Sequence, residues 1–164
     1  MVISSDLASR FIGQYKDFLL YVYHEVLNED KRKDFIAREY YVSNHTLLDQ
    51  FVDITDDIDL EMIDAIKSLR LDMWVYLRDT TKYSLFINPQ ISQSFAVLGL
   101  NDPIKHLFGS SGLTIKTGVC CMDNKYVCDG LISSVVQMGK NYKSEFNEMY
   151  KRHKAEGMFY TKSA

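Results

Sequence analysis

The chain has 164 residues, of which 46% are hydrophobic and 25% are charged, and this ordinary balance excludes wholesale disorder. A chain of this length buries a core without needing disulfides or metals. Its net charge of −3 gives no electrostatic reason to expect a nucleic-acid partner.

The absence of targeting signals and the usage of cysteine predict a cytoplasmic protein. No run of about 18 apolar residues is present, so we expect no membrane span or membrane partner. The first residues, MVISSDLASR, lack the basic and apolar regions of a secretory signal. The three cysteines include two adjacent ones and do not form a disulfide framework, which is typical of a reducing compartment.

The N-terminal part of the chain is predicted to be helical. Apolar residues recur every three or four positions over residues 5–27, which predicts a first helix. Asn28 is expected to cap a second helix, with acids in its first turn, that ends near Tyr41. A short turn of helix is expected over residues 46–52. These elements predict a helical part over residues 1–69.

An acidic segment, residues 49–64, carries seven acids and no base. Its first carboxylates have the spacing of a calcium loop, but the segment lacks the glycine and the glutamate that an EF-hand requires. We interpret these acids as helix caps and as a solvated face. Thr55 or Asp57 is expected to cap a helix that ends near Leu69.

The hydrophobic pattern of the second half predicts a sheet. Residues 72–90 alternate between apolar and polar types about a central turn, which predicts two strands, and a third strand is expected over residues 95–100. Asp102 and Pro103 form a helix-start signal, a cap followed by proline at the first helical position. They predict a short helix that ends at Phe108.

The clearest turn chemistry lies in residues 113–132. Two short strands are predicted to meet at Asp123 and Asn124, residue types that tolerate the backbone of a tight hairpin turn. In that register Cys121 faces Tyr126 across the ladder. This hairpin follows the short helix and completes the predicted sheet.

The same register places Cys121 and Cys128 on one face of the hairpin and Cys120 on the other. A zinc site needs four ligands, usually from closely spaced cysteine pairs, and no histidine lies near these cysteines in the sequence. A redox pair would need a neighbour that lowers a thiol pKa, and none is present in the sequence around them. We interpret the cysteines as small buried hydrophobic residues, and we predict no metal and no cofactor.

After Asp129 and Gly130 the chain is expected to pass into a long amphipathic helix. Gly130 would supply a positive φ at this junction. Apolar residues spaced by three or four predict a helix over Leu131–Ala155, with Gly157 just past its end. The predicted apolar stripe consists of Leu131, Val135, Met138, Tyr142, Phe146 and Met149.

Together these elements predict a single α+β domain over residues 1–164. Its sheet, residues 71–132, is expected to have about five antiparallel strands in the order β-β-β-α-β-β. The C-terminal helix, residues 131–156, is expected to pack on one face of that sheet. The other face is expected to be solvated or used in a contact.

No catalytic signature is present in the sequence. The four histidines belong to no recognised spacing, and the chain has no P-loop, dinucleotide fingerprint, nucleophile elbow or zinc-protease motif. The glycine-flanked loop 109–112 precedes a strand, so it lacks the helix dipole that favours anion binding. His106, three residues past Pro103, is expected near the end of the sheet. We assign no catalytic residue.

One stretch resembles a domain that recurs in uncharacterised bacterial proteins. FAVLGLNDPI (95–104) and YVCDGLI (126–132) are similar to its pattern Val-x-Gly-Leu-x-Asp-Pro-Ile/Leu, followed by Tyr-x-x-Asp-Gly-Leu. The chain departs from that pattern at residues 121–123, where Cys-Met-Asp replaces Leu-Pro-Phe. The resemblance implies a bacterial origin and the strand–helix–hairpin order, and it implies no activity.

The sequence supports two main hypotheses. The first is a non-catalytic binding or regulatory module that meets a protein partner, or a second copy as a homodimer, through an aromatic face. The second is a small-molecule sensor or enzyme with a pocket between the sheet and the first or last helix, where Asp102, His106 and Asp129 are the candidate ligand-binding residues. A third, nucleic-acid binding, depends on the net charge of +3 in residues 140–164. The remaining marked positions are interpreted as structural turn and cap residues: Gly99, Pro103, Asp123, Asn124 and Gly130.

Overall fold

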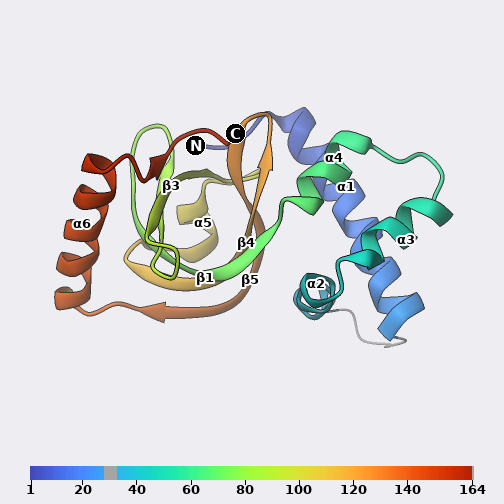
Figure 1. The fold of residues 1–164 in the computed structure, drawn as a ribbon, viewed down its shortest axis with the longest axis horizontal. Coiled ribbons are helices and arrows are strands. Elements are labelled where there is room, and N and C mark those ends of the chain that lie inside the picture. Colours follow the sequence, from blue (N-terminus) through green and yellow to red (C-terminus); the bar gives the residue numbers. More distant parts are fainter. Residues whose placement is uncertain (28–32, 164) are drawn as a thin grey trace.

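The computed structural model describes residues 1–27 and 33–163. The predicted cap Asn28 lies outside these residues. The N-terminal helices gather at one end of the molecule, the strands form the middle, and one C-terminal helix lies at the opposite end (Figure 1). The protein therefore has the predicted α+β composition.

Within the residues that the structure describes, six strands follow the N-terminal helices. They are β1 (Arg70–Asp79), β2 (Ser84–Asn88), β3 (Gln93–Leu98), β4 (Leu113–Met122), β5 (Lys125–Gln137) and β6 (Phe159–Tyr160). The first five close into a barrel, because β2 pairs with both β1 and β3, β3 pairs with β5, and β4 lies between β5 and β1. With a helix between β3 and β4, this is the connectivity of an OB-type Greek-key barrel.

The predicted antiparallel sheet is confirmed in part, because β1 pairs antiparallel with β2 and β4, β2 with β3, and β4 with β5. The prediction of a purely antiparallel sheet is wrong. β3 runs parallel to β5 and to β6, so the six-stranded sheet is mixed. The alternation of apolar residues identifies strands, but it carries no information on which distant strand each one pairs with. The parallel pairing becomes possible because the chain crosses over through a helix and β4 before it returns to β3.

The N-terminal helices are α1 (Ser5–Tyr21), α2 (Asp34–Ser43), α3 (Thr46–Ile54) and α4 (Leu60–Lys67), and α1 continues into a π-helical turn, η1 (Val22–Leu27). The cap of α4 is Asp59, not the predicted Thr55 or Asp57. The carboxylate of Asp59 accepts a hydrogen bond from the backbone N–H of Met62, and Arg10 of α1 donates to it at 2.8 Å. A tertiary ion pair therefore selects which of the neighbouring acids becomes the cap.

An aromatic core joins these helices to one another and to the barrel. The ring of Phe18 lies 4.9 Å from that of Tyr41 and 5.4 Å from that of Phe51, measured between centroids. Cys120 and Val127, on the outer side of the β4–β5 hairpin, are buried in the same cluster. The helical part and the barrel thus share one continuous apolar contact.

The segment after Gly130 is a strand and not the predicted start of a long helix. β5 continues to Gln137, and α6 (Lys140–Ala155) begins only after Gly139. Residues 132–136, ISSVV, are β-branched or short and polar, and such residues favour extended backbone over helix. Apolar residues in this segment also happen to be spaced by three and four positions, and this spacing led to the wrong prediction of a helix.

Gly130 has a φ of 80°, but it adopts this conformation inside β5, as part of a β-bulge. Thr117 of β4 opposes Ile132, whereas Val119 opposes Cys128, so β5 carries two extra residues at this point. A bulge of this kind bends its strand and re-aims the side chains next to it.

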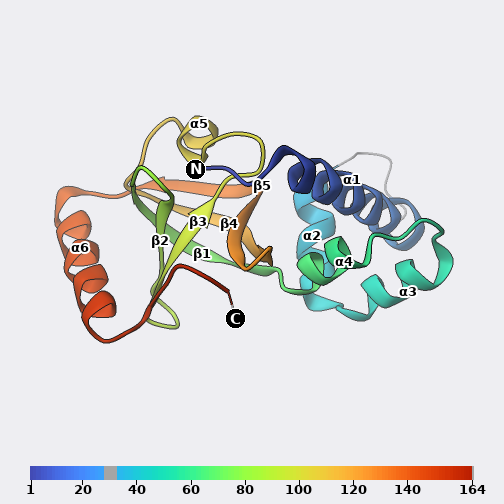
Figure 2. The same ribbon diagram turned by 90° about the horizontal axis from the view of Figure 1, so that it is seen from above.

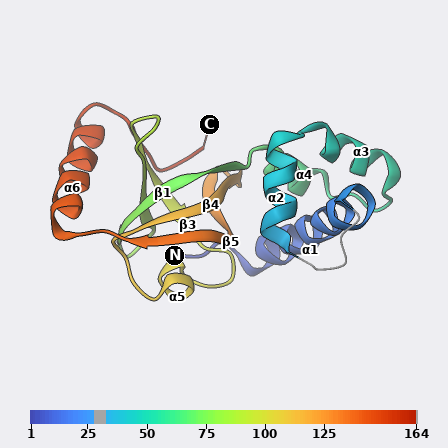
Figure 3. The same cartoon turned by 90° about the horizontal axis from the view of Figure 1, so that it is seen from below.

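α6 covers the outer face of β1 and β2, on the side of the barrel opposite α1–α4 (Figures 2 and 3). Phe146, Met149 and Tyr150 pack there. The strand residues beneath them are Val75, Leu77, Leu85 and Ile87. The predicted packing of the C-terminal helix on the sheet is therefore observed, but two residues of the predicted stripe, Val135 and Tyr142, are 50% and 60% exposed.

α5 (Ile104–Phe108) closes one end of the barrel, where Ile104 is buried in the interior cluster. Gly99 permits the tight turn that leads into it, because a Cβ at this position would collide with the carbonyl group of Asp102. Pro103 itself occupies the cap position, directly before Ile104. The prediction that Asp102 is the cap and Pro103 the first helical residue is therefore wrong by one position.

Candidate ligand pocket

Aromatic side chains fill the barrel interior and position a pocket at the end opposite α5. Trp74 of β1 is buried there, with the ring of Phe95 edge-on at 5.6 Å and that of Phe86 at 6.2 Å. The indole N–H of Trp74 donates a hydrogen bond of 3.0 Å to the carbonyl of Thr117. Packing and this bond fix the ring, so it forms a rigid floor.

The pocket has a volume of about 300 Å³, which is at the lower end of the range for small-molecule sites. Its walls come from β1, β3, β4, β5 and β6. Segments far apart in the sequence must therefore meet before the pocket exists. This explains why no local motif in the sequence predicted it.

The aromatic wall is organised around Phe95 of β3. Tyr126 of β5 stands edge-on to it at 5.0 Å, and Tyr160 of β6 stacks on it at 5.6 Å with 29° between the ring planes. β6 reaches this position because it pairs in parallel with the start of β3, with Tyr160 beside Phe95. Phe95 is buried, whereas Tyr126 and Tyr160 are half-buried and present surface to the pocket.

Polar groups without partners stand among these rings. The Arg70 guanidinium, the Gln93 amide and the Tyr126 hydroxyl line the pocket, and none of them makes a hydrogen bond or ion pair with the described part of the chain. Burial raises the pKa of the Tyr126 hydroxyl, and the charge of Arg70 acts in the opposite direction. The hydroxyl therefore stays protonated near neutral pH and is available as a donor.

The cysteines differ sharply in their surroundings. All three are free thiols, and the predicted register, with Cys121 opposite Tyr126, is observed. Cys120 and Cys128 are fully buried, and burial raises their thiol pKa values, to about 11 for Cys128. Cys121 is half-buried and lines the pocket. Within residues 1–27 and 33–163, no three His, Cys, Asp or Glu side chains are grouped to hold a metal ion.

The structure separates the three candidate residues predicted from the sequence. Asp102 and Asp129 line a second hollow, of about 210 Å³, between α1 and the β5 bulge. Asp102 lies exposed at its rim, whereas His106 is exposed on α5 and does not line it. Two of the three thus meet between the first helix and the sheet.

Asp129 is occupied by bonds within the protein. Arg38 of α2 donates to both of its carboxylate oxygens at 3.1 and 3.0 Å, the Tyr15 hydroxyl donates at 3.0 Å, and the Leu131 N–H donates at 2.9 Å. Burial raises the pKa of Asp129, although Arg38 opposes the shift. Gly118 leaves room for the carboxylate, which a Cβ there would strike. Asp129 therefore has a structural role, because its bonds hold the N-terminal helices to the barrel.

A second buried polar contact holds α6 to the barrel. His153 Nδ1 lies 2.8 Å from Ser94 Oγ of β3, and both residues are buried. Burial lowers the pKa of His153, which keeps the ring neutral near neutral pH. No carboxylate of the described residues bonds to the ring, so the pair lacks the orienting acid of a catalytic triad. No pattern in the sequence predicted this contact, and the only indication for Arg38 is its position between Ala37 and Tyr41 in a helical segment.

The outer face of strands 2 and 3, through which OB-type barrels bind oligonucleotides, is not available here, because α6 lies over it. Among the described residues, no helix combines the length and the apolar character that crossing a bilayer demands. Comparisons with protein-family models, curated proteins and solved structures found no match.

Proposed function

We propose that the protein is a non-catalytic binding module whose ligand occupies the pocket at the open end of the barrel. One observation carries this proposal: unpartnered polar groups of Arg70, Gln93 and Tyr126 converge on the rings of Trp74 and Phe95. Apolar and aromatic walls with a few polar groups that fix orientation are the usual composition of small-molecule sites.

The chemistry of the lining supports binding without turnover. No histidine, aspartate or glutamate of the described chain lines the pocket, so its walls lack the side chains that most often act as general acids and bases. Cys121 is the only thiol on its walls, and no base from the described residues stands beside it to activate it. The pocket lies at the barrel end, whereas the sequence led us to expect one between the sheet and a helix.

Two reporters built into the pocket allow a direct test. Trp74 is the only tryptophan in the chain, and Cys121 is the least buried of its three cysteines. A small aromatic molecule that binds is expected to change the emission of Trp74 and to slow alkylation of Cys121 by iodoacetamide. Cys120 and Cys128 should stay unreactive in the folded protein.

A variant that fills the pocket provides the control. Cys121→Phe is expected to abolish binding, whereas Leu107→Phe, which adds the same ring on the exposed surface of α5, should leave it unchanged. Binding that persists in Cys121→Phe, or that leaves the alkylation rate of Cys121 unaltered, would rule out this pocket.

We also propose a protein contact, self-association through the outer end of β5, on a separate observation. Val135 and Val136 are 50% and 56% exposed. Because neighbouring residues of a strand point to opposite faces, both faces of β5 are uncovered at this point. Residues 133–137 carry no charge and, within the described chain, pair only with β4. An uncovered apolar edge is a template for pairing with another strand.

Sedimentation velocity tests the self-association. The protein is expected to form dimers as its concentration rises, and Val135→Lys, which places a charge on the edge, should remain monomeric. Ser110→Lys, with the same charge on an exposed loop, should behave as the unaltered protein. A monomer at millimolar concentration would exclude the contact. The aromatic face expected from the sequence does not support it, because the rings lie largely inside the cores.

A further inference from the structure

We infer that the ligand of the barrel-end pocket is a small planar aromatic molecule that carries a carboxylate, sulfonate or phosphate group. This inference rests on the proposed function and names the ligand class for the same site. It is carried by the position of one unneutralised guanidinium, that of Arg70, at the rim of an aromatic pocket.

Arg70 differs from two other arginines of the chain in that no acid among the described residues neutralises its charge. Arg10 is neutralised by Asp59 and Glu61, at 2.8 and 2.6 Å, and Arg38 is neutralised by Asp129. Arg70 forms no such pair with the described residues, and no acid lines the pocket beside it. Because the residue is exposed, water solvates its charge while the pocket is empty. A ligand that covers this rim stabilises the guanidinium best by bringing an anionic group with two acceptor oxygens.

The aromatic walls determine the shape of the ligand. The faces of Tyr126 and Tyr160 stand beside buried Phe95, which leaves a site for a flat ring system to stack or to pack edge-on. The hydroxyl of Tyr126 and the amide of Gln93 are free to bond polar atoms on the edge of that ring system. A branched aliphatic ligand of the same volume would use neither feature.

A cationic ligand is excluded by the same geometry. Pockets walled by Trp, Tyr and Phe often bind quaternary ammonium groups through their ring faces. Here Arg70 would repel such a cation, and no lining carboxylate from the described residues would offset that repulsion. The sign of the rim charge therefore selects an anion over a cation.

Two dyes with the same rings separate the effect of charge from that of shape. They are 8-anilinonaphthalene-1-sulfonate, an aromatic anion with a flat naphthalene ring system, and N-phenyl-1-naphthylamine, which lacks the sulfonate. Energy transfer from Trp74 gives the affinity, and protection of Cys121 from iodoacetamide reports that the dye lies in this pocket rather than elsewhere. We expect the sulfonate to bind about tenfold more tightly than the neutral dye, the factor typical of one charge-assisted hydrogen bond.

Arg70→Gln is expected to remove that tenfold difference and to leave the affinity for the neutral dye unchanged. Lys105→Gln, the same loss of charge on exposed α5 at the closed end of the barrel, should preserve the difference. Arg70→Lys, which keeps the charge without the planar fork, should give an intermediate value. A melting curve for each variant identifies any change that comes from altered folding.

Each outcome bears on a different statement. Equal binding of both dyes, unaffected by Arg70→Gln, would overturn the anionic ligand class and leave the proposed function intact. Failure of both dyes to protect Cys121 would instead contradict the proposed function itself. If added salt weakened the binding of both dyes equally, Arg70 would have no electrostatic role, and the ligand class would again be overturned.

Discussion

Arg38 and Asp129 form the ion pair that joins the helices to the barrel, and neither side chain has exposed surface. Every oxygen of Asp129 is hydrogen-bonded, which offsets the cost of removing its charge from water. Removal of one partner would leave an uncompensated buried charge. The pair is therefore much more sensitive to single substitution than an exposed pair.

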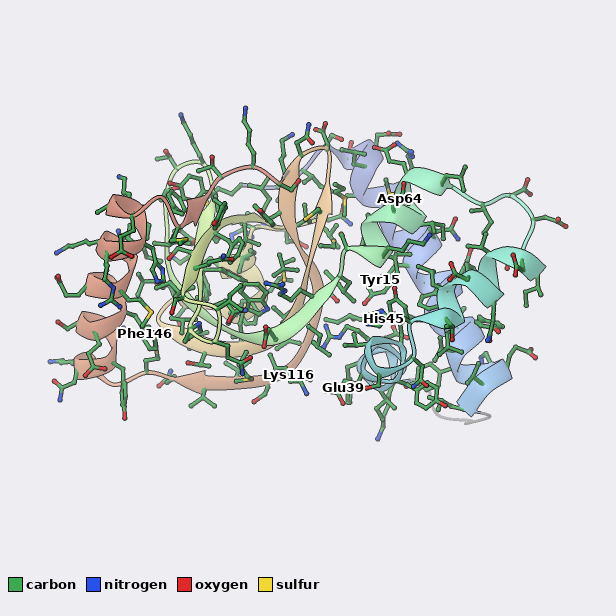
Figure 4. The ribbon with its side chains drawn as sticks, viewed as in Figure 1. Tyr15, Glu39, His45, Asp64, Lys116 and Phe146 are labelled. Carbon is green, nitrogen blue, oxygen red and sulfur yellow. The ribbon has the colours of Figure 1, made fainter. Side chains whose placement is uncertain are left out.

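Arg38→Met is expected to lower the free energy of unfolding by about 3–5 kcal/mol, measured by urea denaturation. Lys116→Met is the matched control. Lys116 of β4 pairs with Glu39 of α2 at 2.6 Å across the same junction, where both side chains are partly exposed (Figure 4). Its loss should cost less than about 1 kcal/mol. Equal effects of the two substitutions would contradict the assigned role of Arg38.

His153 gives the stability a pH dependence whose sign follows from its burial. Its pKa is lowered from the ordinary 6.5, so below pH 6.5 the unfolded chain binds a proton that the folded protein does not. Stability should fall as the pH drops from 6.5 through the lowered pKa, by at most about 1.4 kcal/mol per pH unit. His153→Gln should remove this component, whereas His106→Gln, at an exposed position, should retain it. Identical pH profiles for the two variants would disprove the assignment.

Gly130 isolates the cost of backbone conformation from that of crowding. The nearest atom to a Cβ there is Leu100 Cδ1 at 3.9 Å, so space is available, but φ is 80°. Gly130→Val is expected to destabilise the protein by more than about 1 kcal/mol. Gly13→Val, at an open position in α1, should change stability by less than about 0.5 kcal/mol. An unchanged melting temperature for Gly130→Val would show that the bulge tolerates a side chain.

At the scale of elements, the sequence predicted best what residues decide locally. The hairpin turn at Asp123 and Asn124, with φ of 49° and 56°, depends on those two residues alone. The order of the strands β1 to β4 and the short helix between β3 and β4 followed from periodicity and turn signals. The error at the start of α6 arose where apolar spacing and β-branched residues favoured different structures.

Pairings between distant segments could not be predicted from local patterns. β6 is two residues long and is stabilised by β3, where the Ser94 N–H donates to the Met158 carbonyl at 3.0 Å. Arg38 lay within a weak helical pattern, and its partner Asp129 is 91 residues away. The only available signal was a charged residue between Ala37 and Tyr41, which are buried.

β6 is expected to contribute directly to ligand binding, because it brings Tyr160 to the pocket. Tyr160→Ala should weaken binding of N-phenyl-1-naphthylamine about fivefold, which corresponds to about 1 kcal/mol for one aromatic contact. Tyr142→Ala, which removes an exposed ring from α6, should have no effect on the dye. Equal affinities of the two variants would remove β6 from the binding site.

Across the molecule as a whole, the described residues form three apolar clusters. One fills the helices and reaches the β4–β5 hairpin, one fills the barrel, and one lies between the barrel and α6. Helices thus cover the barrel on two sides, and α5 closes one end (Figures 2 and 3). The aromatic residues that the sequence assigned to an external face mostly build these interiors. The end opposite α5 is left open, and the pocket forms there.

A crystal structure of the protein with 8-anilinonaphthalene-1-sulfonate would show whether the open end of the barrel is a ligand site. We predict that the dye rings lie against Phe95 and Tyr126, with the sulfonate within hydrogen-bonding distance of Arg70. A structure in which the dye occupies the hollow beside Asp102, or the surface of α6, while the barrel end remains empty would contradict the account.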